Sequence, residues 1–114
     1  MCGIAGIAHS GLDQDELREG LAAMNASQLH RGPDEGGLSV IGVRGSGLAS
    51  RRLSIVDIEH GSQPLSNEDG AIHVVLNGEI YNHVPLREEL TQRGHRFRTR
   101  CDTEVVVHLY EEYG

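Results

Sequence analysis

The chain begins with the stretch Met1-Cys2-Gly3-Ile4-Ala5-Gly6-Ile7-Ala8. Residues 3–8 form a short apolar run interrupted by glycine, which is typical of a buried strand that another segment of backbone approaches closely. Cys2 directly precedes this run, and a small side chain at the second position permits removal of the initiator methionine. We therefore expect a core strand that begins at a residue with both a thiol and a free α-amine.

The composition is that of a globular protein and limits the classes of partner. With 114 residues, 38% hydrophobic and 24% charged, the chain has room for one core, so we expect a single domain over residues 1–114. A net charge of −7 is the wrong sign for binding a nucleic-acid backbone. No apolar run approaches the ~20 residues of a membrane-spanning helix, and no secretion signal is visible. We expect a cytoplasmic protein without nucleic-acid or membrane partners.

The rest of the chain predicts helices and strands in alternation. Asp13 and Glu16 have the spacing of a capping box, so a helix is expected from there to about Leu29. The further expected elements are a hairpin of residues 37–44 and 47–55, a loop over 57–69, a strand over 72–76, a helix over 84–93, a short strand at Phe97 and a last helix after Thr103. This order predicts an α+β layered domain.

The ends of the two later helices have their own signals. Pro85 suits a first helical position, Gly94 suits a left-handed C-terminal position, and Thr103 is a candidate N-cap. The last helix is expected to bury one apolar face. That face comprises Val106, Val107, Leu109, Tyr110 and Tyr113.

Cys2 is the sharpest chemical feature. Its α-amine, with a reference pKa of about 7.7 to 8.0, can accept the proton of its own thiol near neutral pH, so that one residue supplies nucleophile and base. The alternative is that Cys2 is a small buried hydrophobic residue. The second cysteine, Cys101, is too distant in sequence for the paired spacing of a zinc site.

Three further positions match the needs of an acyl-transfer site for an amino-acid substrate. Asn77 and Gly78 can offer a side-chain amide and an unhindered backbone N–H to a developing oxyanion, although an ordinary turn is the alternative. Arg52 can bind a carboxylate and Asp102 can bind an ammonium group. As isolated charges, both would more often be solvated surface residues.

Five ordered motifs together resemble a known family. They are Met1-Cys2-Gly3-Ile4-Ala5-Gly6, His30-Arg31-Gly32-Pro33-Asp34, Arg52-Leu53-Ser54-Ile55-Val56-Asp57, Asn77-Gly78-Glu79-Ile80-Tyr81-Asn82 and Asp102-Thr103-Glu104-Val105. This set resembles the class II glutamine amidotransferase domain, an N-terminal-nucleophile hydrolase, in the form found in glutamine-hydrolysing asparagine synthetases. The resemblance implies an αββα sandwich, of which this chain is expected to hold the first half.

The same resemblance implies a reaction and its residues. Cys2 would attack the side-chain amide of L-glutamine, giving a γ-glutamyl thioester that water hydrolyses to glutamate, with release of ammonia. Asn77 and Gly78 would form the oxyanion hole. The substrate would be bound by Arg52 at its α-carboxylate, by Asp102 with Glu79 at its α-amino group, and by the backbone of Leu53, Ser54, Ile55 and Val56. His30, Arg31 and Asp34 would brace the loop beside the site.

The resemblance further implies a partner domain. Ammonia would pass to an ATP-dependent amidation of aspartate on a synthetase domain, in cis or in trans, with ATP and Mg²⁺ expected only there. No Gly-rich phosphate loop occurs in this sequence, so we expect no cofactor in this segment. The chain is about half as long as such domains generally are, and apolar faces left open by a partial fold would favour self-association, for example as a homodimer.

Two positions depart from the family pattern. Ser50 stands where related sequences often have His, two residues before Arg52. Cys101 replaces a residue that is usually Ser or Gly before Asp102, which would place a second thiol near the pocket. We predict that oxidation can join Cys101 to Cys2 in an inhibitory disulfide.

Two other functions are alternatives to this reaction. One is a catalytically silent glutamine-binding or assembly module, which would bind glutamine without releasing glutamate. The other is a metal site, but the seven histidines show no closely spaced ligand pair, so the spacing predicts none.

Overall fold

The computed structural model describes residues 2–8, 11–41, 45–53 and 62–114, which form an α+β fold. Its elements, in chain order, are β1 (Gly3–Ile7), α1 (Gln14–Ser27), β2 (Glu35–Ile41), β3 (Ser46–Arg52), β4 (Leu65–Ser66), β5 (His73–Val74), α2 (His83–Gln92) and α3 (Glu104–Tyr113). The expected class, the N-terminal strand and the hairpin of β2 and β3 are confirmed.

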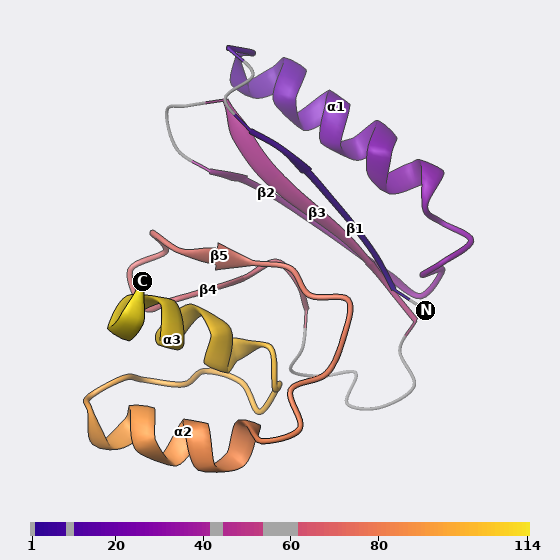
Figure 1. Cartoon of the computed structure of the whole chain (residues 1–114). Coiled ribbons are helices and arrows are strands. Elements are labelled where there is room, and N and C mark those ends of the chain that lie inside the picture. Colours follow the sequence, from indigo (N-terminus) through magenta and orange to yellow (C-terminus); the bar gives the residue numbers. More distant parts are fainter. Residues whose placement is uncertain (1, 9–10, 42–44, 54–61) are drawn as a thin grey trace.

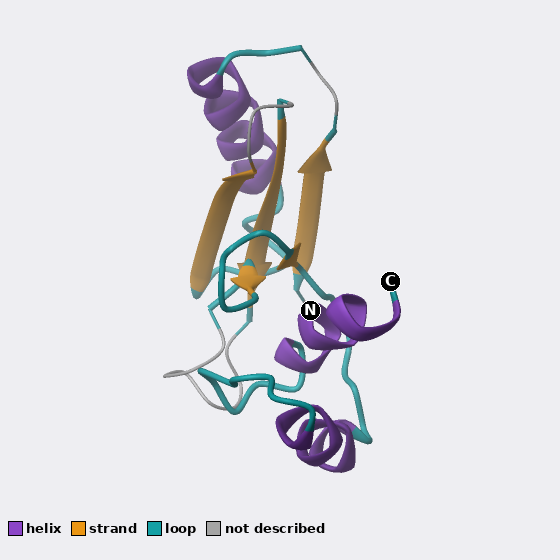
Figure 2. Cartoon of the chain, turned by 90° about the vertical axis from the view of Figure 1, so that its left-hand side faces the viewer, coloured by secondary structure: helices purple, strands orange, loops and turns teal. Residues whose placement is uncertain are grey.

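The first layer is a three-stranded antiparallel sheet in the order β1-β3-β2, with its strands side by side in Figure 2. Helix α1 covers one face of this sheet. Leu17 and Leu21 of α1 pack on Ala49 at the centre of β3, and all three are almost fully buried. Because side chains alternate along a strand, Ser50 and Arg52 of β3 face away from α1.

The predicted capping box at the start of α1 is present. Asp13 Oδ1 accepts a hydrogen bond from the backbone N–H of Glu16 at 2.8 Å, and Glu16 Oε2 accepts one from that of Asp13 at 3.1 Å. These bonds satisfy two N–H groups and so fix where α1 begins.

The second layer lies on the uncovered face of the sheet. Figure 1 shows the order α1, the three-stranded sheet, the β4–β5 pair, and then α3 with α2 beyond it. Polar contacts between described residues join the layers. Among them, Ser39 Oγ lies 3.2 Å from His73 Nδ1, and Ser50 Oγ donates to the carbonyl of Gln63 at 2.8 Å.

Two strand predictions are wrong in extent. Of residues 72–76, only His73 and Val74 pair in a sheet, because the N–H of Leu76 donates to the Gln63 side chain instead of to a strand. Phe97 lies in no strand, and its ring is covered by the guanidinium of Arg87 at 4.4 Å. The predicted loop over 57–69 contains the short strand β4, and residues 57–61 of it lie outside the described residues.

The helix signals are partly confirmed. Gly94 takes the left-handed conformation expected after α2, with φ of 99°. Pro85 is the third residue of α2 rather than its first. It still lies in the first turn, where backbone N–H groups have no partner within the helix, so its lack of an N–H costs no helical hydrogen bond. Thr103 precedes α3 but its side chain does not cap it, because the residues before it already form a turn that engages the first N–H groups.

Helix α3 buries a different face from the one expected. Val105 and Val107 are buried, but so are Glu104 and His108, whereas Tyr110 and Tyr113 are 59% and 62% exposed. The segment just before α3 stabilises the buried Glu104 carboxylate, which accepts hydrogen bonds from the backbone N–H groups of Arg98 and Thr99. Among the described residues, no helix has the length and apolar character that crossing a membrane requires.

Gly37 of β2 provides a test of how closely the two layers meet. A Cβ atom at this position would lie 1.6 Å from the carbonyl oxygen of Gln63, which is backbone and cannot swing aside. We expect Gly37→Ala to lower the free energy of unfolding in urea by at least about 1–3 kcal/mol. Gly20→Ala in α1 is the control, since there a Cβ atom meets only the flexible end of Ile7. Equal stability of the two variants would contradict the close approach.

Candidate active site

A cleft of about 520 Å³ opens where the first layer meets the start of α3. Its walls come from five separated segments of the chain. The lining residues are Cys2, Arg52, Leu53, Gln63, Leu76, Gly78, Glu79, Ile80, Tyr81, His83, Arg100, Cys101, Asp102 and Thr103. The topology thus brings the chain's two cysteines to one cavity, where both are free thiols and half-buried.

The position of Cys2 is fixed from the C-terminal end of α1. Arg31 Nε donates to the carbonyl oxygen of Cys2 at 3.1 Å, and Gln28 Nε2 donates to that of Ile4 at 3.0 Å. Both acceptors belong to the first residues of the chain, so these side chains hold the N-terminal segment without engaging the thiol. Arg31 therefore has the bracing position that the motif suggested.

The Arg-Gly-Pro-Asp loop is held by β3. Arg51 Nε donates to the carbonyl of Gly32 at 2.7 Å, and its Nη2 donates to that of Pro33 at 3.2 Å. A Cβ atom on Gly32 would lie 2.5 Å from the backbone of Arg51 and Arg52, so only glycine fits at this position. The motif thus sets the distance between the loop and the strand that bears Arg52.

Arg52 lines the cleft, and its guanidinium group lies near the carboxylate of Glu35. Its Nη1 lies 3.7 Å from Glu35 Oε2, too far for a hydrogen bond, and the side chain is only 15% exposed. Within the described part of the chain, Nη1 is buried without a hydrogen-bond partner. A buried guanidinium nitrogen in this state favours a ligand carboxylate, which would supply the missing acceptor.

Gln63 connects three walls of the cleft and is almost fully buried. Its Oε1 accepts from the N–H of Leu76 at 2.7 Å, and its Nε2 donates to Thr103 Oγ1 at 3.3 Å. Its backbone carbonyl accepts a hydrogen bond from the Ser50 hydroxyl at 2.8 Å. A single residue therefore joins β3, the segment before Gly78 and the start of α3.

Asp102 lines the cleft next to Thr103. Its Oδ2 accepts from the N–H of Ile80 at 2.6 Å, which ties the Asn77–Tyr81 segment to α3. Its Oδ1 makes only long contacts, 3.6 Å to the Cys101 thiol and 3.5 Å to the Thr103 hydroxyl. This second oxygen can accept a hydrogen bond from a ligand ammonium group.

The structure brings most of the predicted site residues together. Cys2, Arg52, Leu53, Gly78, Glu79 and Asp102 all line the cleft. Asn77 is exposed beside Gly78 and is not one of the lining residues. Ser54, Ile55 and Val56 lie outside the described residues.

Sequence reasoning missed Gln63 and His83. Gln63 lies in a stretch without periodicity, and its three partners are distant in sequence, so no local pattern indicated it. His83 begins α2 and lines the cleft, and its Nδ1 is buried with no hydrogen-bond partner among the described residues. Its place next to the Asn-Gly-Glu-Ile-Tyr-Asn motif was the one available signal.

The cleft can support acyl transfer on a zwitterionic amino acid. Its lining combines a thiol, a guanidinium group, a carboxylate oxygen and a glycine backbone segment. The thiol can attack a carbonyl, and the charged groups can fix a substrate by its α-carboxylate and α-ammonium groups. The walls are fixed by hydrogen bonds between protein groups, so little reorganisation is needed on binding.

Comparisons with known proteins match the whole chain. The family model described as a glutamine amidotransferase domain matches residues 1–114. The chain is 46% identical over 114 residues to the nodule glutamine-hydrolyzing asparagine synthetase of Pisum sativum, with 100% of the chain and 19% of that protein covered. It is 43% identical over 118 residues to glutamine-hydrolyzing asparagine synthetase 1 of Bacillus subtilis, covering 99% and 18%. The chain therefore spans about a fifth of the length of these relatives.

The bridging role of Gln63 predicts the effect of removing its amide. Gln63→Met keeps the length of the side chain but leaves the Leu76 N–H and the Thr103 hydroxyl without their partner. We expect the free energy of unfolding to fall by about 1–3 kcal/mol in urea denaturation. Gln92→Met on the exposed end of α2 is the matched control and should change it by less than about 0.5 kcal/mol. A Gln63→Met protein as stable as the control would show that the bridge does not hold the cleft.

Proposed function

The chain belongs to the glutamine amidotransferase domain family, and we propose on that premise that its cleft hydrolyses the side-chain amide of L-glutamine. The observation that carries this proposal is that Cys2 and Arg52 line one cavity and that Arg52 Nη1 has no hydrogen-bond partner among the described residues. A nucleophile and a carboxylate-binding cation in that arrangement suit an amino acid whose side chain bears an acyl group.

The proposed reaction begins once Met1 has been removed. The α-amine of Cys2 takes the thiol proton, and the thiolate attacks the amide carbon of glutamine. The backbone N–H of Gly78, with the Asn77 side-chain amide turned toward the cleft, stabilises the oxyanion. The carbon–nitrogen bond then breaks, and the α-ammonium group returns the proton to the leaving nitrogen as ammonia departs.

The thioester is hydrolysed by the same residues. Water attacks the thioester carbonyl while the α-amine accepts its proton, and the thiolate leaves and is protonated, so glutamate and free Cys2 are regenerated. Throughout, Arg52 binds the α-carboxylate of the substrate, and Asp102 with Glu79 binds its α-ammonium group. The backbone of residues 53–56 completes the pocket in this proposal.

The destination of the ammonia follows from the relatives. Their names describe glutamine-hydrolysing asparagine synthetases, so we propose that ammonia passes to an ATP-dependent amidation of aspartate, in cytoplasm, on a synthetase domain in cis or in trans. ATP and Mg²⁺ would bind that domain. The layer order α1, sheet, β4–β5 and α3 supports the finer proposal that this fold is part of an N-terminal-nucleophile αββα sandwich.

The first test separates catalysis from silent glutamine binding. We expect Cys2→Ala to lower glutamate release from glutamine at least about 10³-fold, because the nucleophile is lost, while glutamine affinity by calorimetry is kept. Cys101→Ala is the matched thiol control and should keep most of the activity. Glutamine binding without glutamate release by the unmodified protein would instead establish a binding module.

The second test addresses the substrate carboxylate. Arg52→Met removes the guanidinium group but keeps an apolar side chain, so KM for glutamine should rise about 10- to 100-fold, which corresponds to the loss of one charged hydrogen bond. Arg18→Met on the exposed face of α1 is the control and should leave KM unchanged. A kcat loss with an unchanged KM would contradict the binding role of Arg52.

A further inference from the structure

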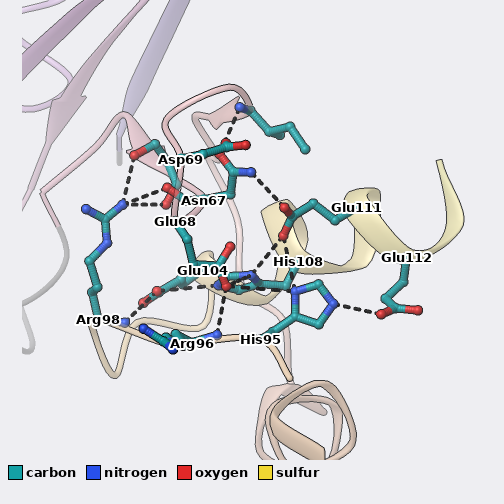
Figure 3. Close-up of polar contacts among 12 residues, drawn as sticks. Asn67, Glu68, Asp69, His95, Arg96, Arg98, Glu104, His108, Glu111 and Glu112 are labelled. Carbon is teal, nitrogen blue, oxygen red and sulfur yellow. Dashed lines mark hydrogen bonds and ion pairs between the residues drawn. The ribbon is translucent and has the colours of Figure 1, made fainter. Parts of the chain in front are cut away.

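Four potential metal ligands meet at α3, and none of them lines the cleft. They are Glu68, His95, His108 and Glu111, and one donor atom of each lies within 4.8 Å of those of the other three. Figure 3 shows their side chains converging from three segments: the loop between β4 and β5, the segment after α2, and α3. The sequence did not indicate this group because only His108 and Glu111 are near one another in the chain.

The spacing of the donor atoms is close to that of a tetrahedral zinc site. Glu111 Oε2 lies 3.1 Å from His95 Nδ1 and 3.3 Å from His108 Nδ1. Glu68 Oε1 lies 3.4 Å from His108 Nδ1 and 3.9 Å from His95 Nδ1. Ligands about 2.0–2.2 Å from a tetrahedral ion are about 3.3–3.6 Å apart, so small side-chain shifts would complete the site.

A neighbouring carboxylate orients the His95 ring: its Nε2 lies 2.8 Å from Glu112 Oε1, which leaves Nδ1 toward the cluster. His108 Nε2 lies 3.6 Å from Glu104 Oε1, beyond hydrogen-bond distance, and is buried with no hydrogen-bond partner among the described residues. The hydrogen bond with His95 holds the pKa of the Glu112 carboxyl below its ordinary value. Carboxylates behind metal-binding histidines act in this way, since they fix the tautomer and the ring direction.

The Glu111 carboxylate is held in a similar manner. Its Oε1 accepts a hydrogen bond from Asn67 Nδ2 at 2.8 Å, which leaves Oε2 directed at the two imidazoles. Asn67 and His108 are both fully buried, whereas Glu68 and Glu111 are about one-third and one-quarter exposed. The site is therefore fixed on its inner side and open to ions on its outer side.

We propose that Glu68, His95, His108 and Glu111 bind one divalent transition-metal ion, zinc being the best match. Two imidazole nitrogens disfavour Ca²⁺ and Mg²⁺, which prefer oxygen ligands, and two carboxylates would neutralise the ion. Four protein ligands fill a tetrahedral shell and leave no position for substrate, so the site is structural. Zinc would join α3 to the segments that precede β5 and follow α2. This inference is independent of the glutamine chemistry.

The test is zinc binding to the purified, untagged protein in which Cys2→Ser and Cys101→Ser remove competing thiols. After treatment with a chelator, zinc is titrated in competition with a chromophoric chelator, and Co²⁺ serves as a spectroscopic probe. We expect one zinc per chain and the visible absorption bands of tetrahedral Co²⁺. His95→Gln and Glu111→Gln should each weaken zinc binding at least about 100-fold and abolish those bands.

Matched controls are available on exposed positions. His30→Gln and Glu88→Gln make the same chemical changes away from the cluster and should leave the zinc affinity within about twofold. Circular dichroism checks that each variant is folded, and Glu68→Gln replaces any variant that is not, because that side chain is partly exposed. Failure to bind one equivalent of zinc, or ligand variants with the affinity of the controls, would overturn the proposal and leave a network of histidine–glutamate ion pairs.

Discussion

The Gln63 side chain accepts a hydrogen bond from the Leu76 N–H and donates one to the Thr103 hydroxyl, while its own backbone carbonyl accepts from Ser50. A carboxamide can donate and accept at once, which neither a carboxylate nor an apolar side chain can do. Because these groups are buried, a donor or acceptor left without a partner would lose its hydrogen bonds to water and gain none in the protein, which would destabilise the fold. The relative positions of β3, the segment before Gly78 and α3 depend on these bonds, and so does the cleft between them.

Helix α3 is held by polar contacts at more than one level. Near its start, Arg87 donates to the carbonyls of Thr99 and Cys101, and Glu104 accepts from the backbone that leads into the helix. Further along, His108 and Glu111 belong to the cluster of Figure 3. A metal ion there would stiffen the helix whose first residues line the cleft. The two sites would then be linked through α3. Metal binding would affect the stability of the cleft but would take no part in its chemistry.

The sequence predicted the parts of the fold that local signals specify. The capping box at Asp13, the left-handed Gly94 and the β2–β3 hairpin all follow from neighbouring residues. The failures came where tertiary contacts decide. The predicted strand at Phe97 gives way to side-chain contacts, and α3 buries the charged Glu104 because the irregular segment before the helix folds back to donate its N–H groups to that carboxylate. The sequence motifs contain most of the residues that line the cleft. They did not predict Gln63, because its hydrogen-bond partners lie in three segments that are brought together only by the fold.

In the proposed reaction, Cys2 becomes the N-terminal residue once Met1 is removed, and it acts as the nucleophile of a cleft that is already formed in the free protein. An intact-mass spectrum of untagged protein, taken before and after exposure to a glutamine analogue with an electrophile at the γ-carbonyl position, tests it most directly. We expect loss of Met1 and a single stoichiometric adduct that maps to Cys2. A correctly processed chain that forms no adduct, or whose adduct maps to Cys101, would contradict it.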